Sequence, residues 1–319
     1  LVLDEPSATL TDHELETLFQ LLKQLRRQDI GIIYISHRLE ELFAIAQRVT
    51  VMRDGKWVNT CDLCDITRED LIRMMVGRDL SETFPRMERT PGKERLQVVD
   101  ISRKKAFTSV GFAIRAGEIV GLTGLVGSGR TEVARAIFGA DPLDQGEIYI
   151  DETPMRIDSP KTAIKAGIGF LTEDRKGQGL VLDMSVRENF SLTHLSDYCR
   201  LDFVDRGRET KRCREFIQAL GIKTPSPEQE AVNLSGGNQQ KVIIAKWVAR
   251  KPRILIVDEP TRGIDVGAKA EVHALLNKLA AEGMSIIVVS SDLPEILAIS
   301  DRVIVLKEGR ITGGFTHQE

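Results

Sequence analysis

An internal repeat constrains the fold of this chain more than any other feature. Asp4 and Asp258 stand 254 positions apart, and each ends an apolar run that continues into Glu-Pro. Between residues 4 and 55 the same offset, without a gap, matches further pairs: Ser36 with Ser290, Arg48 with Arg302, Val49 with Val303 and Gly55 with Gly309. The intervening segments share apolar residues at i, i+3, i+4 and i+7, typical of one amphipathic helix. The chain therefore holds two copies of one domain.

The repeated stretch predicts a strand that ends in two carboxylates. Ile254–Val257 is apolar throughout, as in a strand buried on both faces of a parallel sheet. Asp258 and Glu259 then lie at the carboxyl end, where such sheets place ligands. Asp258 is suited to hold Mg²⁺ and Glu259 to polarise a water beside a γ-phosphate. An acidic turn in solvent is the alternative.

The first copy spans residues 1–80. After the Asp4–Glu5 pair we expect an amphipathic helix from about Asp12 to Gln28, a buried strand at Gly31–Ser36 and a hairpin around Asp54-Gly55. His37 follows the second strand and is suited to contact a γ-phosphate and orient the attacking water, or simply opens a helix. Because the chain starts without Met inside a strand, we expect residues before Leu1 to be missing and this domain to be partial, without its phosphate-binding loop.

The rest of the chain divides into a linker at 81–93, marked by two prolines and a glycine, and a second domain at 94–319. The 44 basic and 47 acidic residues give a net charge of −3, which argues against broad attraction to nucleic acid. No apolar run reaches the roughly 18 residues of a spanning helix, so we expect membrane association only through a partner.

A glycine-rich stretch, GLVGSGRT, follows an apolar strand expected at Glu118–Thr123. It matches the phosphate-binding pattern G-x-x-x-x-G-K-[ST], with Arg in place of Lys. Its glycines let backbone N–H groups face phosphate oxygens, and the following helix adds its positive end. Arg is bulkier and forked, so we expect binding to survive and catalysis to suffer. A plain strand-to-helix turn is the alternative. The candidate binding residues are Gly124, Gly127, Ser128, Gly129, Arg130 and Thr131, with Thr131 also a Mg²⁺ ligand.

A second phosphate-facing helix start is predicted at Leu234–Lys241, LSGGNQQK, through Ser235, Gly236, Gly237 and Asn238. One domain has no need of two such sites, but two head-to-tail domains do if each lends this motif to the other's nucleotide. A plain Ser N-cap is the alternative. Thr172–Lys176, after a strand at Ile168–Leu171, is either functional or a charged turn in solvent.

Together, Gly124–Thr131, LSGGNQQK and the two Asp-Glu-Pro strands resemble the ATP-binding cassette (ABC) family. The fused copies, Arg130 and EDRKGQGL at Glu173–Leu180 narrow the resemblance to the twin-cassette ATP-binding subunits of bacterial monosaccharide importers, the ribose, galactose, xylose and autoinducer-2 group. The resemblance implies α/β P-loop NTPase domains with a mostly parallel sheet, an antiparallel β part and a helical subdomain.

The resemblance also implies two composite sites at a cassette interface. In the competent site, Asp4 would hold Mg²⁺, while Glu5 and His37 would act on water opposite Ser235–Gly237. The other site would use Gly124–Thr131, Asp258 and Glu259, and we expect it to bind ATP and hydrolyse it poorly. Three further positions follow from the resemblance: Ser291 where the family has a catalytic histidine, Glu173 where it has a coupling glutamine, and Asp265 as an interface aspartate.

The function implied is that of a subunit that binds and hydrolyses ATP, with Mg²⁺, to energise import of a monosaccharide-like solute. Its implied partners are integral-membrane permease subunits and, through them, a periplasmic or extracellular sugar-binding protein, with no nucleic acid. Its implied location is the cytoplasmic face of the bacterial inner membrane. Two alternatives stay open: a soluble twin-cassette ATPase acting on ribosomes or DNA, and a nucleotide-binding module without turnover.

Overall fold

The two copies of the repeat form the same succession of elements. The computed structural model describes residues 1–7, 10, 12–36, 38–53, 55–76, 89–200 and 203–316. The first copy contains β1 (Val2–Asp4), α1 (Asp12–Arg27), β2 (Ile33–Ile35), α2 (Leu39–Ile45), β3 (Arg48–Arg53) and β4 (Lys56–Asp62). The second contains β13 (Ile254–Asp258), α10 (Val266–Ala281), β14 (Ser285–Val289), α11 (Leu293–Ile299), β15 (Arg302–Lys307) and β16 (Arg310–Thr316). The bounds of α1, α2, β3 and β4 lie 254 positions before those of their counterparts, which confirms the predicted repeat.

Strand pairing repeats as well. β1 pairs parallel with β2, with Asp4 opposite Ile35, and β13 pairs parallel with β14, with Asp258 opposite Val289. Both β3–β4 and β15–β16 are antiparallel and shift register at the same step of the repeat. The two copies therefore share one backbone conformation. Register depends on turn geometry and on which face is buried, so a shared register indicates that both are alike in the two copies.

One prediction about the first copy is wrong. The strand expected at Gly31–Ser36 exists as β2, but Ile33 and Ile35 are 60% and 48% exposed rather than buried. The physical reason is that β1 and β2 form a sheet of only two strands among the described residues. The predicted helix and hairpin are confirmed as α1 and β3–β4, although Asp54 lies outside the described residues. A 3₁₀ turn η1 (Leu63–Asp65) and α3 (Arg68–Val76) follow the hairpin.

The second copy belongs to a larger sheet. β10 (Ile168–Leu171), β13, β14, β7 (Ile119–Thr123) and β15 run parallel in that order, and β16 adds antiparallel at the edge. Every residue of β7, β10, β13 and β14 is buried, as expected for strands covered on both faces. An antiparallel sheet contains β6 (Phe107–Arg115), β5 (Glu94–Arg103), β8 (Gln145–Ile150) and β9 (Thr153–Pro154).

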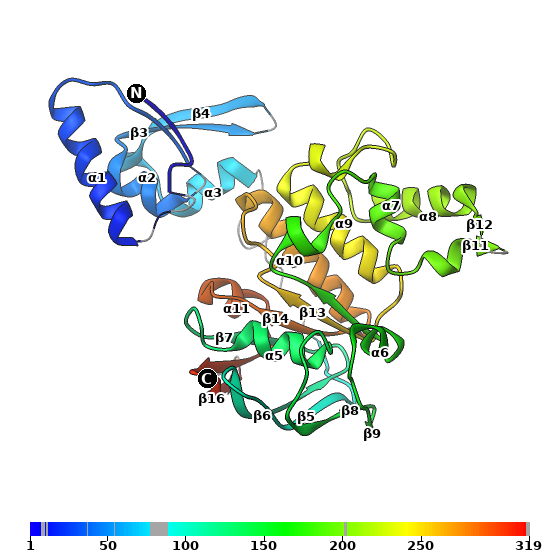
Figure 1. Cartoon of the computed structure of the whole chain (residues 1–319). Helices are drawn as coiled ribbons and strands as arrows, with labels where there is room; N and C mark the ends of the chain where they lie inside the picture. Colours follow the sequence, from blue (N-terminus) through cyan, green and yellow to red (C-terminus); the bar gives the residue numbers. More distant parts are fainter. Residues whose placement is uncertain are drawn as a thin grey trace. The chain divides into compact units, whose positions relative to one another are not determined.

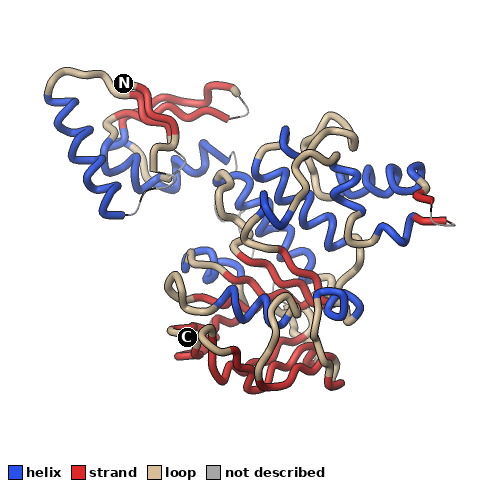
Figure 2. Tube along the Cα trace, in the orientation of Figure 1, coloured by secondary structure: helices blue, strands red, loops and turns tan. Residues whose placement is uncertain are grey.

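Helices complete this part of the chain. They are α5 (Arg130–Ile137), α6 (Pro160–Lys165), the π-helix η2 (Arg175–Gly179), α7 (Val186–Ser191), η3 (Leu195–Tyr198), α8 (Arg206–Ala219), η4 (Ala231–Asn233) and α9 (Gly236–Val248). Figure 1 shows α7, α8 and α9 grouped on the side of the parallel strands away from β5, β6 and β8. The short strands β11 (Cys199–Arg200) and β12 (Phe203–Val204) lie beside α8. The same division into a helical and a strand-rich side is visible in Figure 2. The predicted α/β class, with a mostly parallel sheet, an antiparallel part and a helical subdomain, is confirmed.

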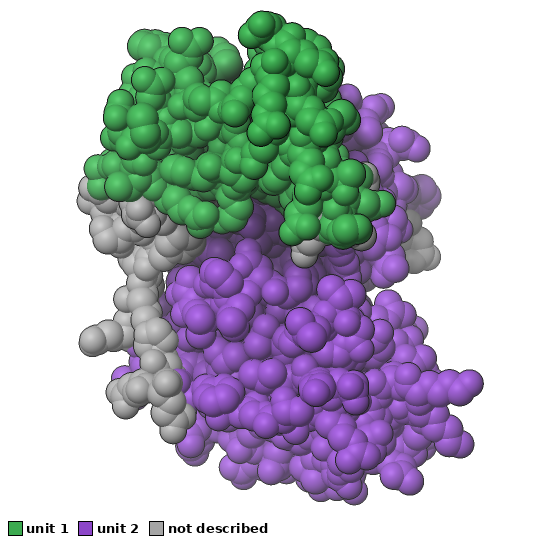
Figure 3. Space-filling model, turned by 90° about the vertical axis from the view of Figure 1, so that its left-hand side faces the viewer, with its two compact units in different colours: residues 1–83, 265–267 green, residues 84–264, 268–319 purple. Residues whose placement is uncertain are grey.

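The chain separates into two units (Figure 3). Unit 1 contains residues 1–83 with 265–267, and unit 2 contains residues 84–264 with 268–319. Most of the linker predicted at 81–93 lies outside the described residues. Within the described ranges, no helix combines the length and the apolar character that crossing a bilayer would require.

Candidate functional site

The glycine-rich stretch joins β7 to α5 in unit 2. Gly124, Gly127 and Gly129 have φ angles of 153°, 79° and 97°, which side chains with a Cβ rarely adopt. A Cβ on Gly124 would collide with the carbonyl oxygen of Leu306. At Gly127, no described atom lies within 4 Å of such a Cβ, and the adjacent Val126 is 91% exposed. The space beside Gly127 is therefore open, as an anion-binding loop requires.

Three buried polar atoms gather at this turn without a hydrogen-bond partner among the described residues: Ser128 Oγ, Arg130 Nη1 and Asp258 Oδ2. Buried polar atoms are normally paired, so these are groups that a ligand would satisfy. The other carboxylate oxygen of Asp258 accepts a hydrogen bond from Thr131 Oγ1 at 3.3 Å. Backbone N–H groups, a guanidinium, a hydroxyl and a carboxylate together fit a phosphate with a divalent cation, which Thr131 and Asp258 would hold.

The Asp258 carboxyl is set up to respond to a cation. It is 1% exposed, and burial raises its pKa to about 7 although the Thr131 hydrogen bond favours the charged form. The neighbouring Glu259 carboxylate also raises this pKa. A bound divalent cation would lower the pKa of Asp258 and so oppose both effects, because it favours the ionised carboxylate at short range.

A cavity of about 440 Å³ opens at this position. It brings together three of the predicted site residues, Thr131, Glu173 and Asp258, which come from three separate segments of the chain. Its full lining is Thr131, Arg135, Phe170, Thr172, Glu173, Asp174, Gln178, Asp258 and Arg262. Sequence reasoning did not single out Arg135, Gln178 or Arg262, although Gln178 lies within EDRKGQGL, because only the fold brings them to one place.

Glu259 is held in a strained backbone conformation directly after Asp258. Its φ of 47° is costly for any residue with a Cβ. Its N–H donates to Val289 O at 2.8 Å, and its Oε1 accepts from the Ser291 N–H at 2.8 Å. Arg130 Nη2 lies 3.8 Å from the same Oε1. Ser291 therefore contacts Glu259 through its backbone, and Arg130 lies beside the carboxylate.

The charged stretch after β10 has a defined conformation in which Thr172, Glu173 and Arg175 are half-buried. Asp174 accepts a hydrogen bond from Gly177 N at 2.8 Å and begins the π-helix η2. Such helices often occur at functional sites. Glu173 forms an ion pair with Arg262, and both line the cavity. No residue pattern announces a π-helix, so the sequence alone could not predict it.

The LSGG residues lie elsewhere in unit 2, at the start of α9, and do not line the cavity. Ser235 is the N-cap of α9, but its Oγ accepts from Asn238 Nδ2 at 2.9 Å instead of from a helix N–H. A Cβ on Gly237 would collide with the side chain of Ala268, so this glycine also permits close packing of α9 on α10. Asp265 is exposed, directly before α10, and is not part of the cavity lining either.

The counterpart residues of unit 1 repeat this backbone. Asp4 ends β1, and Glu5 follows with a φ of 42°. The Glu5 N–H donates to Ile35 O at 2.9 Å. Both Asp4 and Glu5 are exposed. His37, predicted to act beside them, lies outside the described residues.

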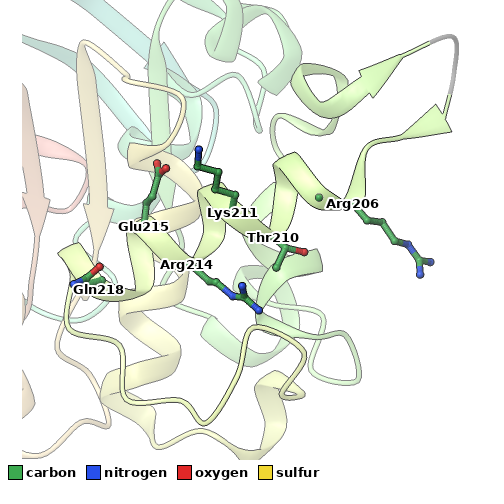
Figure 4. A pocket seen from close by; sticks show the side chains of 7 residues that line it. Arg206, Thr210, Lys211, Arg214, Glu215 and Gln218 are labelled. Atoms are coloured by element: carbon green, nitrogen blue, oxygen red, sulfur yellow. The ribbon is translucent and has the colours of Figure 1, made fainter.

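A larger hollow, of about 600 Å³, runs along α8 and contains none of the predicted site residues. Its lining is Arg206, Gly207, Thr210, Lys211, Arg214, Glu215 and Gln218, all from one helix. Figure 4 shows Lys211 and Glu215 pointing to one side and Arg206 and Arg214 to the other. Because these side chains do not converge, the cavity beside Thr131 is the better candidate site.

Comparison with known proteins agrees with this geometry. Residues 107–262 match the ABC transporter family. A ribose import ATP-binding protein of Oceanobacillus iheyensis is 51% identical over 322 residues, which cover 100% of this chain and 64% of that protein. One from Bacillus subtilis is 49% identical over 313 residues, which cover 98% of this chain and 64% of that protein. The chain thus spans somewhat less than two thirds of the length of these relatives.

Solved structures of ATP-binding cassettes resemble a large part of this chain in fold. A dimeric ATP-binding cassette in a post-hydrolysis state, bound to ADP and Pi, has a TM-score of 0.60 at 26% identity and covers 70% of this chain and 99% of its own. A nucleotide-free cassette from an ABC transporter has a TM-score of 0.62 at 20% identity, covering 70% and 92%. The family match includes the glycine-rich loop, the cavity and the Asp258 strand, and the relatives extend over nearly the whole chain. On these grounds, residues 107–262 of this chain belong to the ABC transporter family.

Proposed function

We propose that this chain binds ATP with Mg²⁺ at the cavity beside Thr131, as one part of an ATPase that energises sugar import through a membrane permease. The observation that carries the proposal is a set of buried atoms, Ser128 Oγ, Arg130 Nη1 and Asp258 Oδ2, that find no hydrogen-bond partner in the described part of the chain and lie next to an open glycine loop. ABC cassettes bind ATP, and the names of the two relatives support a sugar, with ribose the first candidate.

Each role in the cavity and in the loops beside it follows from chemistry. The N–H groups of Gly124–Gly129, the start of α5 and the Arg130 guanidinium would bind the phosphates. Thr131 and Asp258 would hold Mg²⁺, which neutralises phosphate charge when bound. The Glu259 carboxylate, with its orientation set by the Ser291 N–H, would polarise water. Glu173, in its ion pair with Arg262, would couple the state of the nucleotide to the permease.

We extend the proposal to residues outside the cavity. Asp4 would hold Mg²⁺ at a further nucleotide, with Glu5 and His37 acting on its water. Ser235, Gly236, Gly237 and Asn238 would present N–H groups of α9 to a nucleotide held by a facing cassette, and Asp265 would contact such a cassette. In this scheme residues 1–80 are part of one cassette, 81–93 are a linker and 94–319 form a second cassette.

The partners we propose are integral-membrane permease subunits and, through them, a periplasmic or extracellular sugar-binding protein. The ATP-binding subunits of ABC importers work with permease subunits, which would place this chain at the cytoplasmic face of the bacterial inner membrane. The names of both relatives refer to import, so they do not support a ribosome- or DNA-directed ATPase or a module without turnover.

Calorimetric titration of the chain with ATP, with and without MgCl₂, tests the site. We expect Mg²⁺ to strengthen ATP binding to the wild type, and Asp258→Asn to weaken the Mg²⁺-dependent binding by about tenfold or more. Asp183→Asn, an exposed carboxylate outside the cavity lining, serves as the matched control and keeps wild-type affinity. A wild type that does not bind ATP, or an equal Mg²⁺ effect in Asp258→Asn, would contradict the proposal.

Capture from detergent-solubilised bacterial membranes tests the partner. Recovery of a permease on the immobilised chain supports the importer, whereas recovery of ribosomal or DNA-bound proteins alone points to the soluble alternative.

A further inference from the structure

A buried carboxylate joins the two loops that hold Glu259. Glu295 lies on α11 and is 5% exposed. Its Oε2 accepts a hydrogen bond from Ser290 Oγ at 2.5 Å, and its Oε1 lies 2.7 Å from His273 Nε2 of α10. Burial disfavours the charged form, but hydrogen bonds from His273, Ser290 and Thr261 keep the pKa of Glu295 below its ordinary value. An ionised carboxylate in this position can only accept, so each of these neighbours is a donor.

The two loop residues that Glu295 binds flank the contact of Glu259 with Ser291. Thr261 comes two residues after Glu259, and Ser290 comes immediately before Ser291. The Ser291 N–H donates to Glu259 Oε1 at 2.8 Å. Ser290 Oγ also accepts from Asp292 N at 3.1 Å, so the backbone on both sides of Ser291 is anchored. Rotation of the Ser291 peptide plane is thereby restricted, and with it the direction of the N–H that the Glu259 carboxylate meets.

The same arrangement recurs in unit 1, at the same offset of 254 positions. Glu41 is 2% exposed and accepts from Ser36 Oγ at 2.8 Å, and a hydrogen bond from Ser7 helps to lower its pKa. The third donor differs: Tyr34 OH donates to Glu41 at 2.9 Å, whereas in unit 2 the third donor to Glu295 is His273. The two loop hydroxyls are thus common to both copies while the third donor changes. What both copies retain is the link between the loop after Asp-Glu-Pro and the end of the next strand.

We infer that Glu295 is a positioning residue that fixes the Glu259 carboxylate through Ser290 and the Ser291 N–H. The meaning of this link for ATP hydrolysis rests on the proposed function, whereas the link itself is a property of the fold. Glu295 is buried and does not line the cavity, so it acts through its neighbours and not on the nucleotide.

Hydrogen exchange at the Ser291 amide, measured residue by residue by NMR on the whole chain, tests the link without any nucleotide. We expect Glu295→Gln to accelerate this exchange by about tenfold or more, because the amide loses a hydrogen bond to a charged acceptor. Glu259→Gln gives the reference effect of weakening that acceptor directly. Ser290→Ala breaks the link from its other end and reproduces the acceleration even if Glu295→Gln fails to fold.

Two controls separate positioning from loss of stability. Glu41→Gln removes the equivalent carboxylate of unit 1 and leaves Ser291 exchange unchanged. Arg187→Met destabilises unit 2 away from this loop and, under conditions where the chain stays folded, also leaves it unchanged. Wild-type exchange at Ser291 in both Glu295→Gln and Ser290→Ala would overturn the inference.

The catalytic consequence is a split between binding and turnover. In Glu295→Gln we expect ATP affinity within about twofold of wild type and a single-turnover hydrolysis rate lower by about tenfold or more, because small misplacements of a reacting group are costly. Accelerated Ser291 exchange in a chain whose wild type does not bind ATP would leave the link intact and refute the proposed function instead. Accelerated exchange with an unchanged hydrolysis rate would overturn the catalytic part of the inference.

Discussion

Glu5 and Glu259, 254 positions apart in the sequence, adopt the same left-handed backbone, with φ angles of 42° and 47°. In each case the backbone N–H donates to the neighbouring strand, to Ile35 O at 2.9 Å and to Val289 O at 2.8 Å. A residue with a Cβ costs roughly 1–2 kcal/mol in this conformation. Both copies of the repeat retain this strain at the carboxylate that we propose to act on water.

The strain at Glu259 predicts that a glycine variant is more stable than an alanine variant at this position, the reverse of their usual order of stability. Glu259→Gly and Glu259→Ala both lose the carboxylate, but we expect the glycine variant to be more stable by about 1 kcal/mol because it relieves the positive φ. At Glu271, an exposed position inside α10, the same two substitutions should rank the other way by a similar amount. Urea unfolding measures both differences, and an equal order at the two positions would show that Glu259 is not strained.

Gly237 should resist substitution although it lies in a helix. In an open helical position alanine is more stable than glycine by about 1 kcal/mol. Here the added Cβ meets the side chain of Ala268, so we expect Gly237→Ala to lower the free energy of unfolding by about 1–3 kcal/mol. Gly31→Ala, where no described atom lies within 4 Å, should change it by less than about 1 kcal/mol. A neutral Gly237→Ala would mean that α9 and α10 can separate at little cost.

The two ion pairs of α8 should differ strongly in their contribution to stability. Arg187 and Glu209 are 8% and 2% exposed with 2.5 Å between Nη1 and Oε2, whereas Arg212 and Glu215 are 42% and 48% exposed. Arg187→Met leaves the Glu209 charge buried without its cation, so we expect a loss of about 3–5 kcal/mol. Arg212→Met should cost less than about 1 kcal/mol. Chemical denaturation compares the two, and similar losses would contradict the difference in burial.

His194 should make the chain less stable in mild acid. Burial lowers its pKa from 6.5 to about 4, and its Nε2 lies 3.2 Å from Tyr198 OH. Between these two values the unfolded chain binds more protons than the folded one, so stability falls as the pH drops from 6.5 to about 4. The contribution at full effect is about 3 kcal/mol. We expect urea unfolding of His194→Gln to show a flatter dependence on pH across this window. An identical slope in the variant would place the titration elsewhere.

Local sequence patterns predicted much of the fold because their causes are local. The apolar run at Ile254–Val257 produced the buried strand β13, and the helical spacing after Asp12 produced α1. The glycines at 124, 127 and 129 marked positive φ angles, a requirement of the backbone at those residues themselves. The buried strand expected at Gly31–Ser36 was wrong in its burial, since exposure depends on which strands and helices cover it and not on its own apolar character.

The sequence by itself determined the repeat, the strands with their terminal carboxylates, the glycine loop and the helix that begins with Ser235, since each depends on neighbours along the chain. The tertiary structure alone decided that Glu173, Arg262 and Asp258 line one cavity, and that Glu295 joins Thr261 to Ser290 from a helix. It also decided which polar atoms at the turn lack a hydrogen-bond partner among the residues that the structure describes. These facts depend on distances between segments that are remote in sequence. Such distances follow from how sheet and helices pack, for which a single sequence carries no local sign.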